Sequence, residues 1–203
     1  MRSISMQSSR SAMIAFGSSL SGRWGDPTQE IVQSIQRLAE TGIVLLALSS
    51  CYRTCPLGGG RQARYWNAVG LFASAYPPYQ LLRILKRIEG EAGRRRLMRR
   101  WGPRVLDLDL IDSGARVIGW ARRTAGRQLL VLPHPEAHRR GFVLRPLLDV
   151  APHWWHPARG VPARRLWQRL HRTRGDVVRL PDNAPFGGRR DGVASAGESL
   201  ESD

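Results

Sequence analysis

The stretch RWGPRVLDLDL, residues 100–110, contains a strict alternation of leucine and aspartate. Alternate residues of a strand point to opposite faces, so the leucines share one face and Asp107 and Asp109 share the other. Two steps of roughly 3.3 Å separate the aspartate Cα atoms by about 7 Å, which suits carboxylates beside two divalent ions about 3.5–4 Å apart. A strand with one buried and one solvated face alternates in the same way, so the alternation leaves both interpretations open.

Arginines precede this strand. Residues 94–96 and 99–100 are arginines, and guanidinium groups are strong donors to phosphate oxygens. Carboxylates beside arginines predict a site for a metal and a polyphosphate. Arg104 would share the leucine face if the strand were regular throughout, so we expect the regular strand to begin after it.

The composition points to an anionic partner. The 203 residues carry a net charge of +16 at pH 7, with a pI of about 11.6. Lys86 is the only lysine, so nearly all of the positive charge comes from arginine. Because such a strong preference for arginine can have other causes, the net charge is weak evidence for nucleic-acid binding. No apolar run approaches the roughly 20 residues that span a bilayer, so we expect no membrane partner.

The two cysteines predict free thiols. In an extended segment Cys51 and Cys55 would lie about 13 Å apart, beyond the roughly 4.4–6.8 Å of a disulfide. We therefore expect a cytoplasmic protein.

The order of the expected elements predicts an α+β fold. Strands are expected over 12–16, 44–52, 65–74 and the aspartate stretch, and helices start at Asp26-Pro27 and Pro77-Pro78. This β-α-β-β-α-β order predicts a ferredoxin-like sandwich, a mainly antiparallel sheet with helices packed on one face.

The second half of the chain is expected to add smaller elements. These are a hairpin or loop over 113–128, a short strand over 129–132, a helix over 142–150 broken by Pro146, and a helix over 164–170. We expect one domain over 12–171, a disordered segment over 1–11 and an extension over 172–203 that is mostly disordered from about 184.

Two other patterns resemble known sites and lack a required residue. Residues 17–22 have the glycine spacing of a P-loop, but Arg23 and Trp24 stand where that loop needs Lys and Ser or Thr. His134 and His138 have the spacing of a helical zinc pair without an H-E-x-x-H pattern, and the prolines beside His134 disfavour a helix there. For His134 we expect a phosphate or ribose contact instead.

The motif RWGPRVLDLDL, together with PHPEAHRRGFVLRPL at 133–147, resembles the 6-hydroxymethyl-7,8-dihydropterin pyrophosphokinase family. The resemblance extends over residues 12–170 and includes SSCYRTCPLG at 49–58. It implies a ferredoxin-like fold and the transfer of pyrophosphate from MgATP to the hydroxymethyl group of the pterin, with AMP as the second product, in folate biosynthesis. ATP and the pterin would be the partners. Apart from the resemblance, we expect no nucleic-acid partner and take a monomer as the default.

The resemblance also implies roles for individual residues. Asp107 and Asp109 would hold two Mg²⁺ ions, and Arg96 and Arg104 would join them as catalytic residues. The implied ATP contacts are Glu89, Arg94, Arg96, Arg100, Trp101, Arg104, His134 and Arg140. The implied pterin contacts are Thr54, Leu57, Gly58, Tyr65, Asn67, Trp101 and Phe142.

Several positions depart from the family pattern, and among them Leu129 and Val131 fall where polar ATP contacts can occur. Ser19 stands where the family has an asparagine, Cys55 where proline or glutamate is usual, and Lys86 where a nucleotide-contacting glutamine can occur. These departures bear on nucleotide affinity more than on the reaction.

Two alternatives remain open at this point. A basic RNA-binding module on a ferredoxin-like sheet would need aromatic RNP-like strands, which the sequence lacks. A family member that binds pterin or nucleotide without catalysis would not need the Asp107/Asp109 pair.

Overall fold

The computed structural model describes residues 10–55, 63–93, 102–120, 130–170 and 177–180. Its main sheet is antiparallel, and at its centre β1 (Arg10–Ser18) is paired along its whole length with β4 (Tyr65–Ser74). The strand order is β5-β1-β4-β3-β8, and β2 also pairs with β4. The bounds of the outer strands are β2 (Val44–Leu48), β3 (Tyr52–Thr54), β5 (Asp107–Ser113) and β8 (Val177–Arg179).

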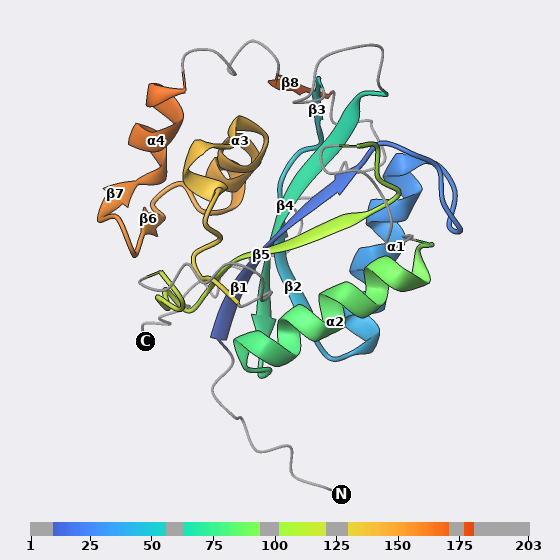
Figure 1. Ribbon diagram of the computed structural model, residues 1–203, viewed down its shortest axis with the longest axis horizontal. Coiled ribbons are helices and arrows are strands. Elements are labelled where there is room, and N and C mark those ends of the chain that lie inside the picture. Colours follow the sequence, from blue (N-terminus) through green and yellow to red (C-terminus); the bar gives the residue numbers. More distant parts are fainter. Residues whose placement is uncertain (1–9, 56–62, 94–101, 121–129, 171–176, 181–203) are drawn as a thin grey trace, which may run out of the picture.

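The first half of the chain confirms the predicted ferredoxin-like α+β topology. Helices α1 (Pro27–Glu40) and α2 (Pro78–Glu91) lie together against one face of the sheet (Figure 1). The expected strand over 44–52 is divided into β2 and β3. At the division the Ser49 hydroxyl, rather than a main-chain carbonyl, accepts the Val69 N–H at 3.0 Å, so the regular ladder stops there.

Helix α1 begins where its sequence predicts. The Asp26 carboxylate accepts the N–H groups of Thr28 and Gln29, and the Gln29 side chain accepts the N–H of Asp26. This reciprocal capping satisfies donors that would otherwise be left over in the first turn.

The expectation that helices cover only one face is wrong. The C-terminal elements η1 (Ala137–Arg139), α3 (Gly141–Val150), β6 (Trp155–His156), β7 (Val161–Pro162) and α4 (Ala163–Arg169) form a layer on the opposite face (Figure 1). The cause is that β1 is apolar on both faces. Its Ile14 and Phe16 pack in the core beside α1 and α2, whereas Met13 and Ala15 pack with α3 and α4.

The C-terminal half differs from the prediction in three further respects. Helix α3 continues through Pro146, which is buried, so the predicted break is wrong. The strand expected over 129–132 is reduced to one bridge between Leu132 and Ile118. Strand β8 was not predicted and pairs with β3. The residues of the predicted disordered tail lie outside the described ranges.

The described part also bears on two simpler expectations. Cys51 is buried, Cys55 is exposed and both are free thiols, as predicted. Among the described residues, no helix is long and apolar enough to cross a membrane.

Candidate active site

The two aspartates of β5 lie on the sheet face that α3 covers. In the antiparallel register Asp107 stands opposite Gly17 and Asp109 opposite Ala15, and Ala15 packs in the core beside α3. Leu108 and Leu110 point the other way into the core beside α1 and α2. The predicted alternation is therefore confirmed, and the two carboxylates keep about a quarter of their side-chain surface exposed, 28% and 25%.

Each aspartate has a cationic neighbour. Arg104 Nη1 donates to Asp107 Oδ1 at 2.8 Å, and Arg140 Nη1 donates to Asp109 Oδ2 at 3.3 Å. Because β5 begins only at Asp107, Arg104 is free of the strand alternation and reaches the aspartate face, as predicted. The arrangement places guanidinium donors and carboxylate acceptors side by side, as a metal–polyphosphate ligand requires.

The main chain of Arg104 is held by the residue after β1. Ser19 N–H donates to the Arg104 carbonyl at 2.8 Å, and the Arg104 N–H donates to the Ser19 hydroxyl at 2.9 Å. The neighbouring Ser18 hydroxyl donates to the Val105 carbonyl. Two consecutive serines therefore fix the segment that leads into β5.

His134 lies beside Asp109, with 3.7 Å between His134 Nε2 and Asp109 Oδ2. The Glu136 N–H donates to His134 Nδ1 at 3.2 Å, so Nδ1 is an acceptor. Burial lowers the pKa of His134 from its ordinary value, against the opposing effect of the Asp109 charge. The side chain is thus neutral at pH 7 and presents an Nε2–H donor on the site side.

The predicted pterin residues of β3 and β4 lie on the same face. Asn67 Nδ2 donates to the Thr54 hydroxyl at 2.9 Å, and the Tyr65 hydroxyl donates to the Gly102 carbonyl at 2.6 Å. These bonds fix one buried amide and one ring close to the segment that contains Arg104.

Gly17 lies between the two halves of the site. It stands opposite Asn67 on β4 and opposite Asp107 on β5, so the three residues form one row across three strands. A Cβ at position 17 would lie 3.5 Å from Asn67 Oδ1 and 3.9 Å from Asp107 Cβ. The absent side chain leaves the floor of the site open between the amide and the carboxylate.

The start of α3 lies beside this row. Arg140, whose guanidinium reaches Asp109, also lies over the Phe142 ring, with 5.7 Å from its central carbon to the ring centroid. The stretch 133–142 therefore brings a charged group to the aspartates and an aromatic ring next to it.

The donor set fits magnesium rather than a metal enclosed by protein. Among the described residues, no group of three or more His, Cys, Asp or Glu side chains could hold a metal ion. Magnesium usually binds through one or two carboxylates and completes its octahedral shell with water and substrate phosphates. Asp107 and Asp109 supply that number of carboxylates.

Comparison with known families decides the identity of the chain. The family described as 7,8-dihydro-6-hydroxymethylpterin-pyrophosphokinase matches residues 13–152, which include both aspartates, Asn67 and the stretch 133–142. The chain belongs to this family. The resemblance drawn from the two motifs is thus confirmed.

Relatives of this pyrophosphokinase support the assignment. The chain is 39% identical over 143 residues to the 2-amino-4-hydroxy-6-hydroxymethyldihydropteridine pyrophosphokinase of Haemophilus influenzae, covering 69% of this chain and 81% of that protein. Identity to the Pseudomonas aeruginosa enzyme of the same name is 38% over 142 residues, covering 68% of this chain and 79% of that one.

A solved structure supports the fold. The wild-type HPPK-DHPS of Plasmodium falciparum matches with a TM-score of 0.58 at 12% identity, over 79% of this chain. This pyrophosphokinase chain spans 44% of that structure, so the comparison concerns one part of a larger protein.

The structure brings together many of the residues predicted for the site, although their roles stay predictions. The described residues on the aspartate face are Thr54, Tyr65, Asn67, Asp107 and Asp109 on the strands, with Arg104, His134, Arg140 and Phe142 beside them. The predicted residues Leu57, Gly58, Arg94, Arg96, Arg100 and Trp101 lie outside the described residues. Glu89 is buried at the end of α2, where it accepts the Leu108 N–H at 2.7 Å.

Sequence reasoning missed two contributions to this pyrophosphokinase site. The sequence places Gly17 in a P-loop-like spacing and in the segment after the first strand, but its pairing with two other strands is not visible in the sequence. Ser19 was noted only as a missing amide. A serine directly after a strand is a local signal for a main-chain hydrogen bond, although its partner 85 residues away could not be inferred.

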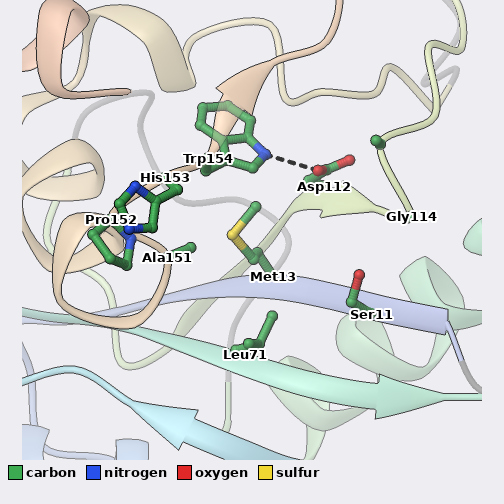
Figure 2. Close-up of a pocket in the computed structure, with 10 residues that line it drawn as sticks. Ser11, Met13, Leu71, Asp112, Gly114, Ala151, Pro152, His153 and Trp154 are labelled. Carbon is green, nitrogen blue, oxygen red and sulfur yellow. Dashed lines mark hydrogen bonds between the residues drawn. The ribbon is translucent and has the colours of Figure 1, made fainter. Parts of the chain in front are cut away.

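A pocket lies at the other end of β1 from Gly17, and none of the predicted site residues lines it. It has a volume of about 410 Å³ and is lined by Met13, Leu71, Asp112 and residues 151–154, among others. Figure 2 shows the Trp154 indole N–H donating to the Asp112 carboxylate, a bond of 2.8 Å. Burial raises the pKa of Asp112.

Proposed function

We propose that this protein transfers pyrophosphate from MgATP to the hydroxymethyl group of 6-hydroxymethyl-7,8-dihydropterin. Membership of the family supports the reaction, and the observation that carries its placement is the row of Asn67, Gly17 and Asp107 across three strands. In this reaction the hydroxymethyl oxygen bonds to the β-phosphorus of ATP. The bond from that phosphorus to the oxygen shared with the α-phosphate breaks, AMP leaves, and the hydroxyl proton is released.

We propose that Asp107 and Asp109 hold two magnesium ions together with the phosphates of ATP. Bound there, the ions would supply positive charge that offsets the negative charge of the phosphates. Arg104 and Arg140 are already directed at the two carboxylates and would also donate to phosphate oxygens. The His134 Nε2–H is a third donor from the same side. Because its pKa is lowered, the His134 ring is uncharged at pH 7.

The pterin would occupy the other end of the row. Asn67 would read the edge of the heterocycle, and its amide is held in place by Thr54. Tyr65 and Phe142 would contact the flat ring, because aromatic faces suit a planar heterocycle. Gly17 leaves room for the hydroxymethyl group to pass from the pterin end to the phosphate end.

AMP release tests this proposal directly. Purified protein is incubated with MgATP and 6-hydroxymethyl-7,8-dihydropterin, and AMP is expected to form only when both substrates are present. Asp107→Ala should lower the rate at least about 100-fold, because metal affinity falls steeply when a ligand is lost. Asp112→Asn, on the same strand but outside the site, is the matched control and should retain activity.

Two outcomes would contradict the proposal. Full activity of Asp107→Ala would refute the metal assignment. Absence of AMP release, combined with RNA binding that weakens steeply with salt, would instead favour a nucleic-acid-binding module.

A further inference from the structure

Strand β5 is an edge strand, and the middle of its outer edge is held by side chains of α2. Glu89 Oε1 accepts the Leu108 N–H at 2.7 Å, and Lys86 Nζ donates to the Leu108 carbonyl at 3.1 Å. Lys86 Nζ also lies 2.7 Å from Glu89 Oε1, so the two side chains form an ion pair one helical turn apart. Leu108 is the residue between Asp107 and Asp109.

The geometry of an antiparallel pair explains why this contact is available. The N–H and C=O of one residue point to the same side of the strand, and the next residue points to the other side. Because β5 pairs with β1 on one side only, the Leu108 groups point outward, where no strand lies in the described sheet. Glu89 and Lys86 supply the acceptor and the donor that a neighbouring strand would otherwise supply.

Only the carboxylate of this ion pair is buried. The Glu89 side chain is 3% exposed and that of Lys86 is 35% exposed, so a buried carboxylate faces a partly exposed ammonium. Bonds between ionised side chains and main-chain groups are about twice as strong as neutral ones. An edge strand held in this way is fixed at the residue that lies between the two aspartates.

We propose that Lys86 and Glu89 are positioning residues, which hold Leu108 and so fix the spacing of the Asp107 and Asp109 carboxylates for the metal–nucleotide complex. The inference rests on the proposed function, because it concerns the same two carboxylates. It gives Lys86, a departure from the family pattern, a role through the main chain of β5.

The test uses three variants of the full chain. Lys86→Met keeps the aliphatic stem and removes the donor, and Lys86→Arg restores a charged donor. Arg83→Met removes the same charge from an exposed position one turn earlier on α2, and it serves as the matched control.

Two readouts do not depend on turnover. The first is the hydrogen-exchange rate of the Leu108 amide, measured by NMR, which should rise about tenfold in Lys86→Met and stay unchanged in Arg83→Met. The second is the Mn²⁺ concentration that half-saturates the protein in the presence of a non-hydrolysable ATP analogue. It should rise about tenfold in Lys86→Met, within the range measured when residues that orient metal ligands are removed, and return toward the wild-type value in Lys86→Arg.

The outcomes separate this inference from the proposed function. If the wild-type protein releases AMP and Lys86→Met binds Mn²⁺ as tightly as the wild type, the positioning role is refuted. If the wild type binds Mn²⁺ and the analogue, loses this affinity in Lys86→Met, and releases no AMP, the positioning role stands and the proposed reaction fails.

Discussion

Replacing Gly17 by alanine adds one methyl group to the floor between Asn67 and Asp107. The new Cβ would lie 3.5 Å from Asn67 Oδ1 and 3.9 Å from Asp107 Cβ, both ordinary van der Waals distances. The strand can therefore accept alanine without moving its neighbours. Because glycine loses more conformational freedom on folding than alanine, the substitution should stabilise the protein by about 0.5–1 kcal/mol.

The same methyl group should damage the reaction. It projects about 1.5 Å from the strand into the space through which the hydroxymethyl group would reach the phosphates. A displacement of reacting groups by about 1 Å can cost about 100-fold, which equals about 2.7 kcal/mol of transition-state stabilisation. We expect kcat/KM for the pterin to fall about 100-fold in Gly17→Ala while the melting temperature stays constant or rises.

The assay combines AMP release under saturating MgATP with thermal unfolding of the same samples. Gly90→Ala is the matched control, since a Cβ at that position in α2 would meet no atom within 4 Å. It should raise the melting temperature without changing kcat/KM. A folded Gly17→Ala protein with wild-type kcat/KM would show that the open floor between Asn67 and Asp107 has no part in the reaction.

Two further predictions concern the Ser19 contact and the buried histidine of β6. Ser19→Ala removes the acceptor of the Arg104 N–H. We therefore expect the free energy of unfolding in urea to fall by about 1–2 kcal/mol and the KM for MgATP to rise, and Ser19→Asn should restore both. An unchanged KM would contradict the role of the contact. Burial, helped by the charges of His138 and Arg159, lowers the pKa of His156 from 6.5 to about 4, so the folded protein favours the neutral ring. In the unfolded chain this histidine takes up a proton near pH 6.5. The contribution of the neutral ring to the free energy of unfolding should therefore be fully present above that pH, and it should fall by up to about 3 kcal/mol as the pH drops towards 4. Urea unfolding between pH 7.5 and 4.5 checks this, and His156→Phe should flatten the dependence; an equally steep fall in that variant would assign it to other groups.

The elements that the sequence predicted correctly are those whose signals are local. The Asp26 cap, the proline at the start of each of α1 and α2, and the leucine–aspartate alternation of β5 each act within a few residues. Such signals fix the type of an element and one of its ends. They predicted β4 over its full length, because its apolar run stands between clear loops.

The features that escaped prediction depend on partners far away in the chain. The Ser49 hydroxyl divides the expected second strand only because Val69 lies opposite it, 20 residues later. The second helical layer follows from the apolar residues on both faces of β1, which the sequence displays but does not assign to a partner. The bond between Ser19 and Arg104 likewise exists only in the folded chain. For the site, the motifs identified Asp107 and its neighbours, whereas the residues that hold them in place needed the structure.

The position of Lys86 allows a lysine-specific protease to report on the contact between α2 and β5. Because the chain contains a single lysine, such a protease has one target bond, between Lys86 and Arg87, inside a helix that ends at Glu91. A helical bond must unfold locally before it can enter a protease, so the rate of this one cut measures how often α2 leaves the sheet. The reaction would divide the chain into residues 1–86 and 87–203, two fragments easily resolved on a gel. A nucleotide that binds at β5 and stabilises this contact would lower the rate of cleavage at Lys86, so its binding could be detected without a label.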